Sequence, residues 1–328
     1  SIEDLPSGVD VAFVSVPASG VADVVRRLDA AGVPAAVVIS NGFTPNEESE
    51  LRALARTGGV IMHGPICMGL INISVSVTLC TAEITANVGR GKVALLVQSG
   101  SAGIALMNVL GVGLSKIVTL GSEFRLTSTD YLHWLAGDPH TSVVGLVLES
   151  IQDPEAFALA VRAVHAAGKH IVALKVGRSA IGALAAQAHT GSMITPADAY
   201  DCFFRQCGVP TVADYEQMAA SLECLATVKS LPKGPRIGIL GISGGETALA
   251  CDIAGELGIP MAHWSDETSA RVRQALPGAT GRNPLDLGAS IGDARSAGET
   301  TALDAIASDP SVDILVAIQD AQDTLPPQ

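Results

Sequence analysis

One histidine stands in a setting that suits nucleophilic chemistry. His189 lies in the run Ala188-His-Thr-Gly191, among small residues that let a bulky reactant approach the imidazole closely. A neutral imidazole is a good nucleophile at physiological pH, provided that an acceptor anchors its second nitrogen. A solvent-exposed loop histidine would give the same pattern, and residue chemistry alone does not separate the two interpretations.

A carboxylate that could anchor this imidazole is Glu149, which directly follows the apolar run Val143–Leu148. In open α/β sheets the carboxyl ends of parallel strands face the ligand crevice. A carboxylate there can hold a histidine in one tautomer, although a strand-end glutamate more often faces solvent. The other histidines lack such a setting, and we expect them on the surface or in loops: His63, His133, His140, His165, His170 and His263.

A turn of small residues, Ser99-Gly-Ser-Ala-Gly103, follows the strand-like run Val93–Gln98 and precedes a helix-like stretch. Small residues let the backbone approach a ligand, and the free N–H groups of a helix start attract a phosphoryl group. An ordinary strand-to-helix turn explains the run equally well. For the similar run Gly241-Ile-Ser-Gly-Gly-Glu246 we favour the ordinary turn.

A third loop, His63-Gly-Pro-Ile-Cys-Met-Gly69, is too stiff and too small for a helix. Its backbone could cradle a small carboxylate. Loops with Pro and Gly are frequent, however, so a structural turn with a buried cysteine is the more common case. Cys67 is a still weaker candidate nucleophile, because no base neighbours it in the sequence.

Strand-like apolar runs alternate with Ala-rich helical stretches along the chain, and these elements must position the candidate residues. The alternation predicts an α/β fold of doubly wound parallel sheets with right-handed crossovers. Aromatic residues make up only 3% of the sequence, so the cores must be built from Ala, Val, Leu and Ile. The predicted strands are Val9–Val16, Ala35–Ser40, Val60–His63, Val93–Gln98, Lys116–Thr119, Val143–Leu148, His170–Lys175, Arg236–Gly241 and Asp313–Gln319.

Two breaks with Gly, Pro and charged residues, Ala86–Lys92 and Leu231–Pro235, predict domain boundaries. We therefore expect three Rossmann- or flavodoxin-like domains, at residues 1–89, 90–232 and 233–328. The sequence opens without Met on Ser-Ile-Glu-Asp-Leu-Pro, then reaches the strand-like run Val9–Val16, and it ends on Leu-Pro-Pro-Gln. From this we expect an incomplete first domain, a truncated third domain and a longer whole polypeptide.

Composition and charge narrow the classes of partner. The formal net charge of −13 argues against general nucleic-acid binding, but phosphate ligands stay open because backbone N–H groups can hold them. Six cysteines without a CxxC pair favour reduced thiols in a cytoplasmic protein over a disulfide framework or a zinc site. No apolar run reaches membrane-spanning length uninterrupted, and no signal peptide opens the sequence. We therefore expect a cytoplasmic protein that engages no membrane, no nucleic acid and no protein-bound metal.

Eight stretches follow one another in an order that resembles the NDP-forming acyl-CoA synthetase family, the superfamily of ADP-forming acetyl-CoA synthetase and succinyl-CoA synthetase. No single stretch is specific, but the combination is, and it covers nearly the whole chain. The stretches are Asp10–Ala18, Gly64–Asn72, Gln98–Gly103, Tyr131–Pro139, Leu148–Glu149, Leu174–Ser179, Ala188–Ser192 and Asn283–Leu287.

The resemblance implies a reaction in which a carboxylic acid, CoA and ATP give acyl-CoA, ADP and phosphate. It implies that ATP phosphorylates His189, that the phosphoryl group passes to the acid, and that the CoA thiol attacks the acyl phosphate. Glu149 matches the carboxylate that orients the phosphohistidine. The phosphate-binding helix start corresponds to Ser99, Gly100, Ser101 and Ala102. The CoA and acyl contacts correspond to Val16, Pro17, Asn41, Gly42, Pro65, Ile66, Cys67, Met68 and Gly69.

The sequence departs from the family pattern at Ile66, where the family usually has Asn between Gly-Pro and Cys. Replacing an amide by an apolar group reshapes the acid pocket, so we expect an acid other than acetate or succinate, larger or more apolar. Two further departures are Gly121-Ser-Glu in place of the usual Gly-Asn-Glu, and Ser243-Gly-Gly-Glu246 at the Gly-Gly motif of the third domain.

The family's ATP-grasp domain, which binds the nucleotide, has no counterpart in these residues. The resemblance therefore implies that ATP with Mg²⁺ is bound mainly by an ATP-grasp domain elsewhere in the polypeptide or in a β subunit, within a homodimer or an α/β oligomer. The main alternative is a CoA-responsive regulatory domain of a protein acetyltransferase, but such regions typically lack the phosphorylated histidine. A nicotinamide-dependent dehydrogenase would need a GxGxxG turn followed by an acidic residue, which the sequence lacks.

Overall fold

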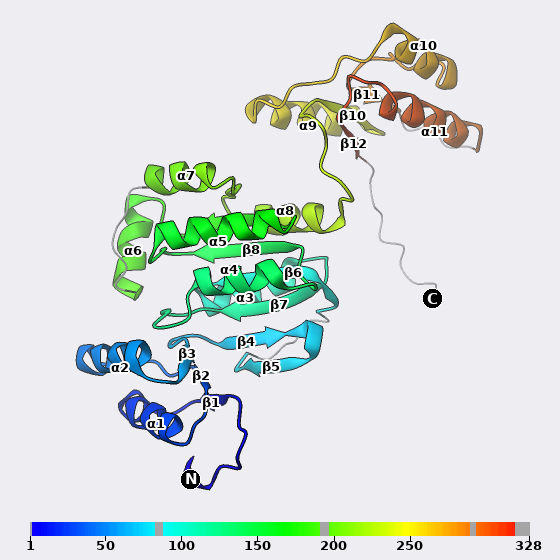
Figure 1. Cartoon of the computed structure of the whole chain (residues 1–328). Coiled ribbons are helices and arrows are strands. Elements are labelled where there is room, and N and C mark those ends of the chain that lie inside the picture. Colours follow the sequence, from blue (N-terminus) through cyan, green and yellow to red (C-terminus); the bar gives the residue numbers. More distant parts are fainter. Residues whose placement is uncertain (1, 83–87, 191–196, 289–292, 319–328) are drawn as a thin grey trace, which may run out of the picture. The chain divides into compact units, whose positions relative to one another are not determined.

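The computed structural model describes residues 2–82, 88–190, 197–288 and 293–318. The chain divides into two compact units, Ser1–Val228 and Lys229–Gln328 (Figure 1). Both are α/β units with mostly parallel strands, which confirms the predicted fold class. The division into three domains stays a prediction. Within the described residues, no helix combines the length and the apolar character needed to cross a lipid bilayer.

The N-terminal part of the first unit is a small parallel sheet with two helices. Its elements are a 3-10 turn at Ile2–Asp4, β1 (Ala12–Val14), α1 (Ala18–Ala30), β2 (Ala35–Val38), α2 (Pro45–Thr57) and β3 (Ile61–His63). The strand order is β1-β2-β3, with Val37 opposite both Phe13 and His63. Helix α2 begins with a capping box, in which Thr44 and Glu47 each accept a hydrogen bond from the other's amide.

A six-stranded sheet forms the larger part of the first unit. Its strands are β4 (Gly69–Asn72), β5 (Val77–Cys80), β6 (Arg90–Val97), β7 (Leu114–Thr119), β8 (Val143–Leu148) and β9 (His170–Lys175). Their spatial order is β5-β4-β7-β6-β8-β9. The last four of these pair in parallel, with Leu148 opposite Lys175 at the end of the β8–β9 ladder. Their continuous apolar runs, typical of strands covered on both faces, had predicted them.

The antiparallel hairpin of β4 and β5 was not predicted. In it Leu70 lies opposite Leu79 on one side and Val118 of β7 on the other. A 3-10 turn at Ile73–Val75 joins the two strands, and Ser76 takes a left-handed conformation. The hairpin falls within the expected first domain, residues 1–89, yet its hydrogen bonds join it to the six-stranded sheet.

Helices cover both faces of the six-stranded sheet. They are α3 (Gly100–Val109), α4 (Ser128–Gly137), α5 (Pro154–Ala166), α7 (Ala197–Gln206) and α8 (Tyr215–Thr227). Helix α6 (Ala180–Thr190) follows β9, and its Ile181 and Leu184 side chains are exposed. Because successive strand residues point to opposite faces, Leu96 of β6 packs in the core beneath α4 and α5, whereas Leu95 packs in the core beneath α3 and α8. The carboxyl ends of β6 and β8 then lie at one edge, where Ser99 and Glu149 follow them.

The second unit is a three-stranded parallel sheet with three helices. Its elements are β10 (Ile237–Gly241), α9 (Gly244–Glu256), α10 (Asp266–Ala275), β11 (Leu285–Asp286), α11 (Asp293–Ala307) and β12 (Ile314–Ile318), and the strand order is β11-β10-β12. The side chain of Asn283 ties this sheet together, because it accepts from the amide of Ile239 at 2.9 Å and donates to the carbonyl of Ile237 at 2.8 Å. The two-residue strand β11 was too short to be predicted.

Candidate active site

The predicted phosphate-binding turn begins helix α3. Ser99 is its N-cap residue, but its side chain makes no capping hydrogen bond to the first turn and instead lies 3.0 Å from the hydroxyl of Ser101. Gly100 is half-buried, and Ala102 points into the core with 1% of its surface exposed. Ala102 can therefore contribute only its backbone. The uncapped first turn leaves N–H groups available to an anion, as the sequence predicts.

The loop of residues 64–69 connects the two sheets of the first unit. Ile66 has a left-handed backbone with φ of 57°, and its amide donates to the carbonyl of Ser40 at 3.1 Å, at the end of the first sheet. Two residues later, the amide of Met68 donates to the hydroxyl of Thr119 in β7 at 2.9 Å. One short loop thus joins the carboxyl end of the first sheet to the carboxyl end of β7 in the second sheet.

The same loop contacts the helix start. A Cβ atom built on Gly100 would lie 2.4 Å from both Cγ and Sδ of Met68, so the Met68 side chain packs directly on the glycine. A small apolar cavity adjoins this contact, between the β4–β5 hairpin and α3. Its lining includes Met68, Gly69, Ile71, Cys80, Gly100, Ile104 and Met107. The structure therefore brings the predicted acyl loop and the predicted phosphate turn together.

Glu149 directly follows β8 and is half-buried. Its amide and the amide of Ser150 both donate to Oε1 of Gln98, the residue that precedes the phosphate turn. The other end of the same side chain, Nε2 of Gln98, donates to the carbonyl of Ser150 at 2.9 Å. The backbone that carries Glu149 is thus clamped to the start of α3.

Lys175 at the end of β9 is a cation beside Glu149 that the sequence analysis did not single out as a site residue. Only 7% of its surface is exposed, and its Nζ lies 4.5 Å from the ring centroid of Tyr200. Burial lowers the pKa of the Lys175 ammonium, while the negative charge of Glu149 partly offsets this effect. Its position as the last residue of the apolar run His170–Lys175 was the available signal.

His189 belongs to helix α6, next to its last residue, Thr190. The helix follows β9 through a short turn, in which the hydroxyl of Ser179 accepts from the amide of Gly182 at 3.0 Å. The side chain of His189 lies outside the part of the chain that the structure describes, and so do residues 191–196. The expected pairing of His189 with Glu149 therefore stays a prediction.

His63, the last residue of β3, and Cys67, within the loop of residues 64–69, are deeply buried. His63 was expected on the surface, but only 2% of it is exposed, and its Nδ1 lies 2.7 Å from the hydroxyl of Tyr131 in α4. Burial lowers the pKa of His63 to about 4. Burial also raises the pKa of the Cys67 thiol to about 12, so the thiolate needed for nucleophilic attack is disfavoured.

The predicted CoA-contacting residues outside this loop lie at the carboxyl ends of β1 and β2. The carbonyl of Val16 accepts from the hydroxyl of Ser40 at 2.6 Å, which links the two strand ends. Pro17 is the N-cap residue of α1, and the exposed Asn41 and Gly42 follow Ser40. Strand ends are the usual ligand edge of such sheets.

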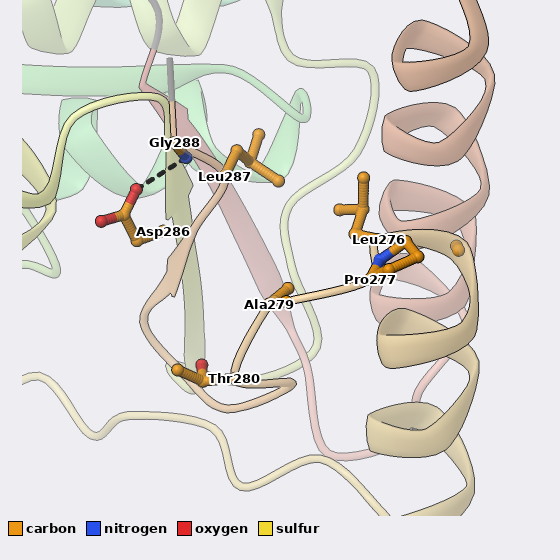
Figure 2. Close-up of a pocket in the computed structure, with 9 residues that line it drawn as sticks. Leu276, Pro277, Ala279, Thr280, Asp286, Leu287 and Gly288 are labelled. Carbon is orange, nitrogen blue, oxygen red and sulfur yellow. Dashed lines mark hydrogen bonds between the residues drawn. The ribbon is translucent and has the colours of Figure 1, made fainter. Parts of the chain in front are cut away.

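The second unit contains a separate cavity of about 590 Å³ (Figure 2). Asp286 and Leu287, from the Asn283–Leu287 motif, form part of its lining. Figure 2 shows the Asp286 carboxylate turned back on its own loop, where it accepts from the amide of Gly288 at 2.8 Å. Among the site residues predicted from the sequence whose side chains the structure describes, none lines this cavity.

The chain is similar in sequence and structure to known CoA ligases. Residues 90–225 match the model of the succinyl-CoA ligase like flavodoxin domain. The α subunit of acetate–CoA ligase [ADP-forming] II from Pyrococcus furiosus is 31% identical to the chain, across 97% of the chain and 70% of that subunit. The chain belongs to the NDP-forming acyl-CoA synthetase family. Within that family it corresponds to the α-type part, as its match to an α subunit indicates.

Two other members of the family extend the comparison. Acetyl-coenzyme A synthetase 1 of Candidatus Korarchaeum cryptofilum, solved with phosphate and ADP, superposes with a TM-score of 0.87 and 29% identity, over 98% of this chain and 70% of that chain. The trans-feruloyl-CoA synthase FCS1 of an unknown prokaryotic organism is 33% identical over 87% of this chain. The chain covers only 42% of that synthase, and it spans about half the length of several other relatives.

Proposed function

We propose that the protein containing this chain is an acid–thiol ligase, which converts a carboxylic acid, CoA and ATP into acyl-CoA, ADP and phosphate. The observation that carries the proposal is the contact between Met68 and Gly100. It joins a loop suited to an acyl group with a helix start suited to a phosphoryl group, and an acyl phosphate needs both. The names of the relatives, a CoA ligase and a CoA synthase, support the same reaction over a purely regulatory role.

In the proposed mechanism, a nitrogen of His189 attacks the terminal phosphorus of the nucleotide, the P–O bond to ADP breaks, and a P–N bond forms. A carboxylate oxygen of the acid then attacks the phosphorus and displaces the histidine, giving an acyl phosphate. The sulfur of CoA attacks the acyl carbon, phosphate leaves, and the thiol proton is lost. Each step exchanges one activated bond for another, so no single step needs a large change in free energy.

The chain's own residues have distinct roles in this scheme. Backbone N–H groups at Ser99–Ala102 bind the phosphoryl oxygens, since the Ser99 side chain leaves them uncapped. Glu149 accepts a hydrogen bond from the imidazole of His189 and thereby orients it. The CoA cleft is formed by Val16, Pro17, Asn41 and Gly42. The thiol end of the bound CoA is directed to the loop of residues 65–69.

The nucleotide, with Mg²⁺, belongs to an ATP-grasp domain in the same polypeptide or in a β subunit. The name of the Pyrococcus furiosus relative, an α subunit, supports a divided arrangement for that protein. We propose a homodimer or an α/β oligomer for the protein containing this chain.

The proposal is tested with the full-length protein, together with its ATP-grasp partner, and ATP labelled in the terminal phosphate. Wild-type protein is expected to acquire a label that is stable in base and labile in acid, and His189→Ala is expected to abolish it. His133→Ala is the matched control, because His133 is an exposed histidine of the same unit. Unchanged labelling of His189→Ala would contradict the phosphohistidine.

The acid is identified by assaying CoA-dependent release of phosphate with a panel of carboxylic acids. The relatives' names already include acetate and trans-ferulate, so the panel should contain short aliphatic, longer aliphatic and aromatic acids. Ile66 leads us to expect that an acid larger or more apolar than acetate gives the highest kcat/KM. A preference for acetate would contradict this expectation without affecting the phosphohistidine.

A further inference from the structure

Glu123 combines an unusual backbone with deep burial. Its φ of 50° lies in the left-handed region, which residues with a large side chain seldom adopt. Only 2% of its surface is exposed, although it carries an ionisable group. Such costs are retained where the surrounding structure over-determines the conformation, and they cluster at functional sites.

The backbone around Glu123 is held by the acyl loop. The amide of Ser122 donates to the carbonyl of Pro65 at 2.8 Å, and the amide of Phe124 donates to the carbonyl of Gly64 at 3.1 Å. A Cβ atom on Gly121 would lie 2.2 Å from the Pro65 carbonyl oxygen, so only glycine allows this close approach. The turn of residues 121–124 is therefore fixed to the loop of residues 64–66.

The side chain of Glu123 points to the other parts of the candidate site. Its Oε1 accepts from the amide of Ser128 at 2.7 Å, and its Oε2 accepts from Nε2 of Gln98 at 3.1 Å. Gln98 in turn receives the amides of Glu149 and Ser150 on its Oε1. Hydrogen bonds thus link the Glu123 side chain through Gln98 to the backbone of Glu149, and the acyl loop holds the residues on either side of Glu123.

Both oxygens of Glu123 face N–H donors, which suits the carboxylate form. Burial nevertheless raises the pKa of Glu123 to about 7, with a contribution from the nearby negative charge of Asp130 in α4. Tyr131 of the same helix is a second titratable neighbour, and Glu149 is linked through Gln98. Protonation of the Glu123 carboxyl would place its O–H group opposite an N–H donor, either the Ser128 amide or Nε2 of Gln98, and so weaken that hydrogen bond.

We infer that Glu123 is a positioning residue, which acts through Gln98 to fix the backbone of Glu149 and so the orientation of the phosphorylated histidine. The inference rests on the proposed function, since it gives Glu149 its role there. It assigns to Glu123 no contact with the acid, with CoA or with the nucleotide. Glu123 instead affects the position and orientation of the Glu149 carboxylate, which directly follows β8.

The first test is a double-mutant cycle of Glu123→Gln and Gln98→Ala in the full-length protein, followed by the rate of phosphoprotein formation from labelled ATP. Glu123→Gln keeps the shape but retains only one acceptor, so the maximal rate should fall about tenfold to a hundredfold, with the half-saturating ATP concentration unchanged. If Glu123 acts through Gln98, the double variant is no slower than Gln98→Ala alone. Additive effects would overturn the inference.

A destabilised control separates positioning from general loss of structure. Asp138→Asn breaks a buried ion pair with Lys116 in the same unit and should lower stability while leaving the phosphorylation rate of the folded protein unchanged. If Asp138→Asn slowed phosphorylation as much as Glu123→Gln did, a specific role for Glu123 would be refuted.

The second test does not depend on catalysis. Amide hydrogen exchange at residues 149 and 150 is measured in wild type and in Glu123→Gln, with Asp138→Asn as the control. The inference requires exchange at these two amides to increase more in Glu123→Gln than in the control, relative to the other amides of the six-stranded sheet. Unchanged exchange would overturn it even if the protein were never phosphorylated, whereas a lack of phosphorylation with altered exchange would refute only the proposed function.

Discussion

Met68 lies so close to Gly100 that a single added carbon on the glycine would come within 2.4 Å of two Met68 side-chain atoms. The phosphate turn and the acyl loop are therefore in van der Waals contact across the boundary between two sheets. Because Met68 is flexible, it can move away from an added methyl group, but only by leaving the position that it holds against the helix start.

Gly100→Ala should slow phosphoprotein formation while leaving the stability of the protein nearly unchanged. Alanine is favoured over glycine in a helix by up to about 1 kcal/mol, which offsets the cost of displacing Met68, so the thermal unfolding midpoint should change little. Phosphoprotein formation should slow, because the displaced side chain alters the turn. Met68→Ala combined with Gly100→Ala should recover most of the rate of phosphoprotein formation. If it does not, the displaced Met68 side chain is not the cause of the slower rate.

Ile66→Asn should change both acid preference and stability. Ile66 is 45% exposed with φ of 57°, a conformation that costs a β-branched residue roughly 1–2 kcal/mol and that asparagine tolerates better. The free energy of unfolding should therefore increase by up to about 1 kcal/mol. The kcat/KM for acetate should increase relative to longer acids.

Ile66→Ala is the matched control for that substitution, because it removes the apolar group without adding an amide. If the amide matters, only Ile66→Asn should shift the preference. Equal acid preference in all three proteins would show that residue 66 does not determine the acid.

His63 and Glu123 should give stability opposite dependences on pH. The folded-state pKa of His63 is about 4, below its ordinary value, so its contribution is present above about pH 6.5 and is lost as pH falls towards 4. The folded-state pKa of Glu123 is about 7, above its ordinary value, so its contribution is present below about pH 4.5 and is lost as pH rises through 7. Each contribution amounts to about 3 kcal/mol.

Urea unfolding between pH 5 and 7 checks this opposition. In His63→Gln, only the Glu123 contribution remains, and the free energy of unfolding should increase as the pH is lowered. In Glu123→Gln, it should decrease instead. Wild-type protein should change less than either variant, and parallel pH profiles for the two variants would contradict the assignment.

Lys116→Met should be among the most destabilising substitutions in the first unit. Nζ of Lys116 lies 2.5 Å from Oδ2 of Asp138, and both side chains are buried. Removing the cation leaves a buried carboxylate with Thr141 as a remaining hydrogen-bond donor, which costs about 3–5 kcal/mol. Urea unfolding at pH 7 measures the loss, and Lys116→Met with Asp138→Asn should lose less than Lys116→Met alone.

Local patterns in the sequence predicted much of the fold. Continuous apolar runs located β8 and β9 at their observed bounds, Val143–Leu148 and His170–Lys175, because strands buried on both faces are apolar throughout. They also placed Glu149 at a strand end. The order of the family-like motifs predicted the ligase family, which the comparison with relatives confirms.

Other features were decided by contacts between residues far apart in the sequence. The β4–β5 hairpin was missed because β7, with which β4 also pairs, lies far along the chain, as in the pair Gly69 and Thr119, and no local period indicates such pairing. His63 was expected on the surface, but Tyr131 from another element covers it. The site role inferred for Glu123 likewise depends on Gln98 and the acyl loop, which reach it only in the folded chain.

The sequence by itself predicted which residues could take part in phosphoryl transfer and located the strands that precede them, since residue types and apolar runs are local properties. Only the tertiary structure decided that Gly100 meets Met68 and that Gln98 joins Glu123 to the backbone of Glu149. The physical reason is that packing and hydrogen bonding select partners by distance in space, and separation along the chain does not encode that distance.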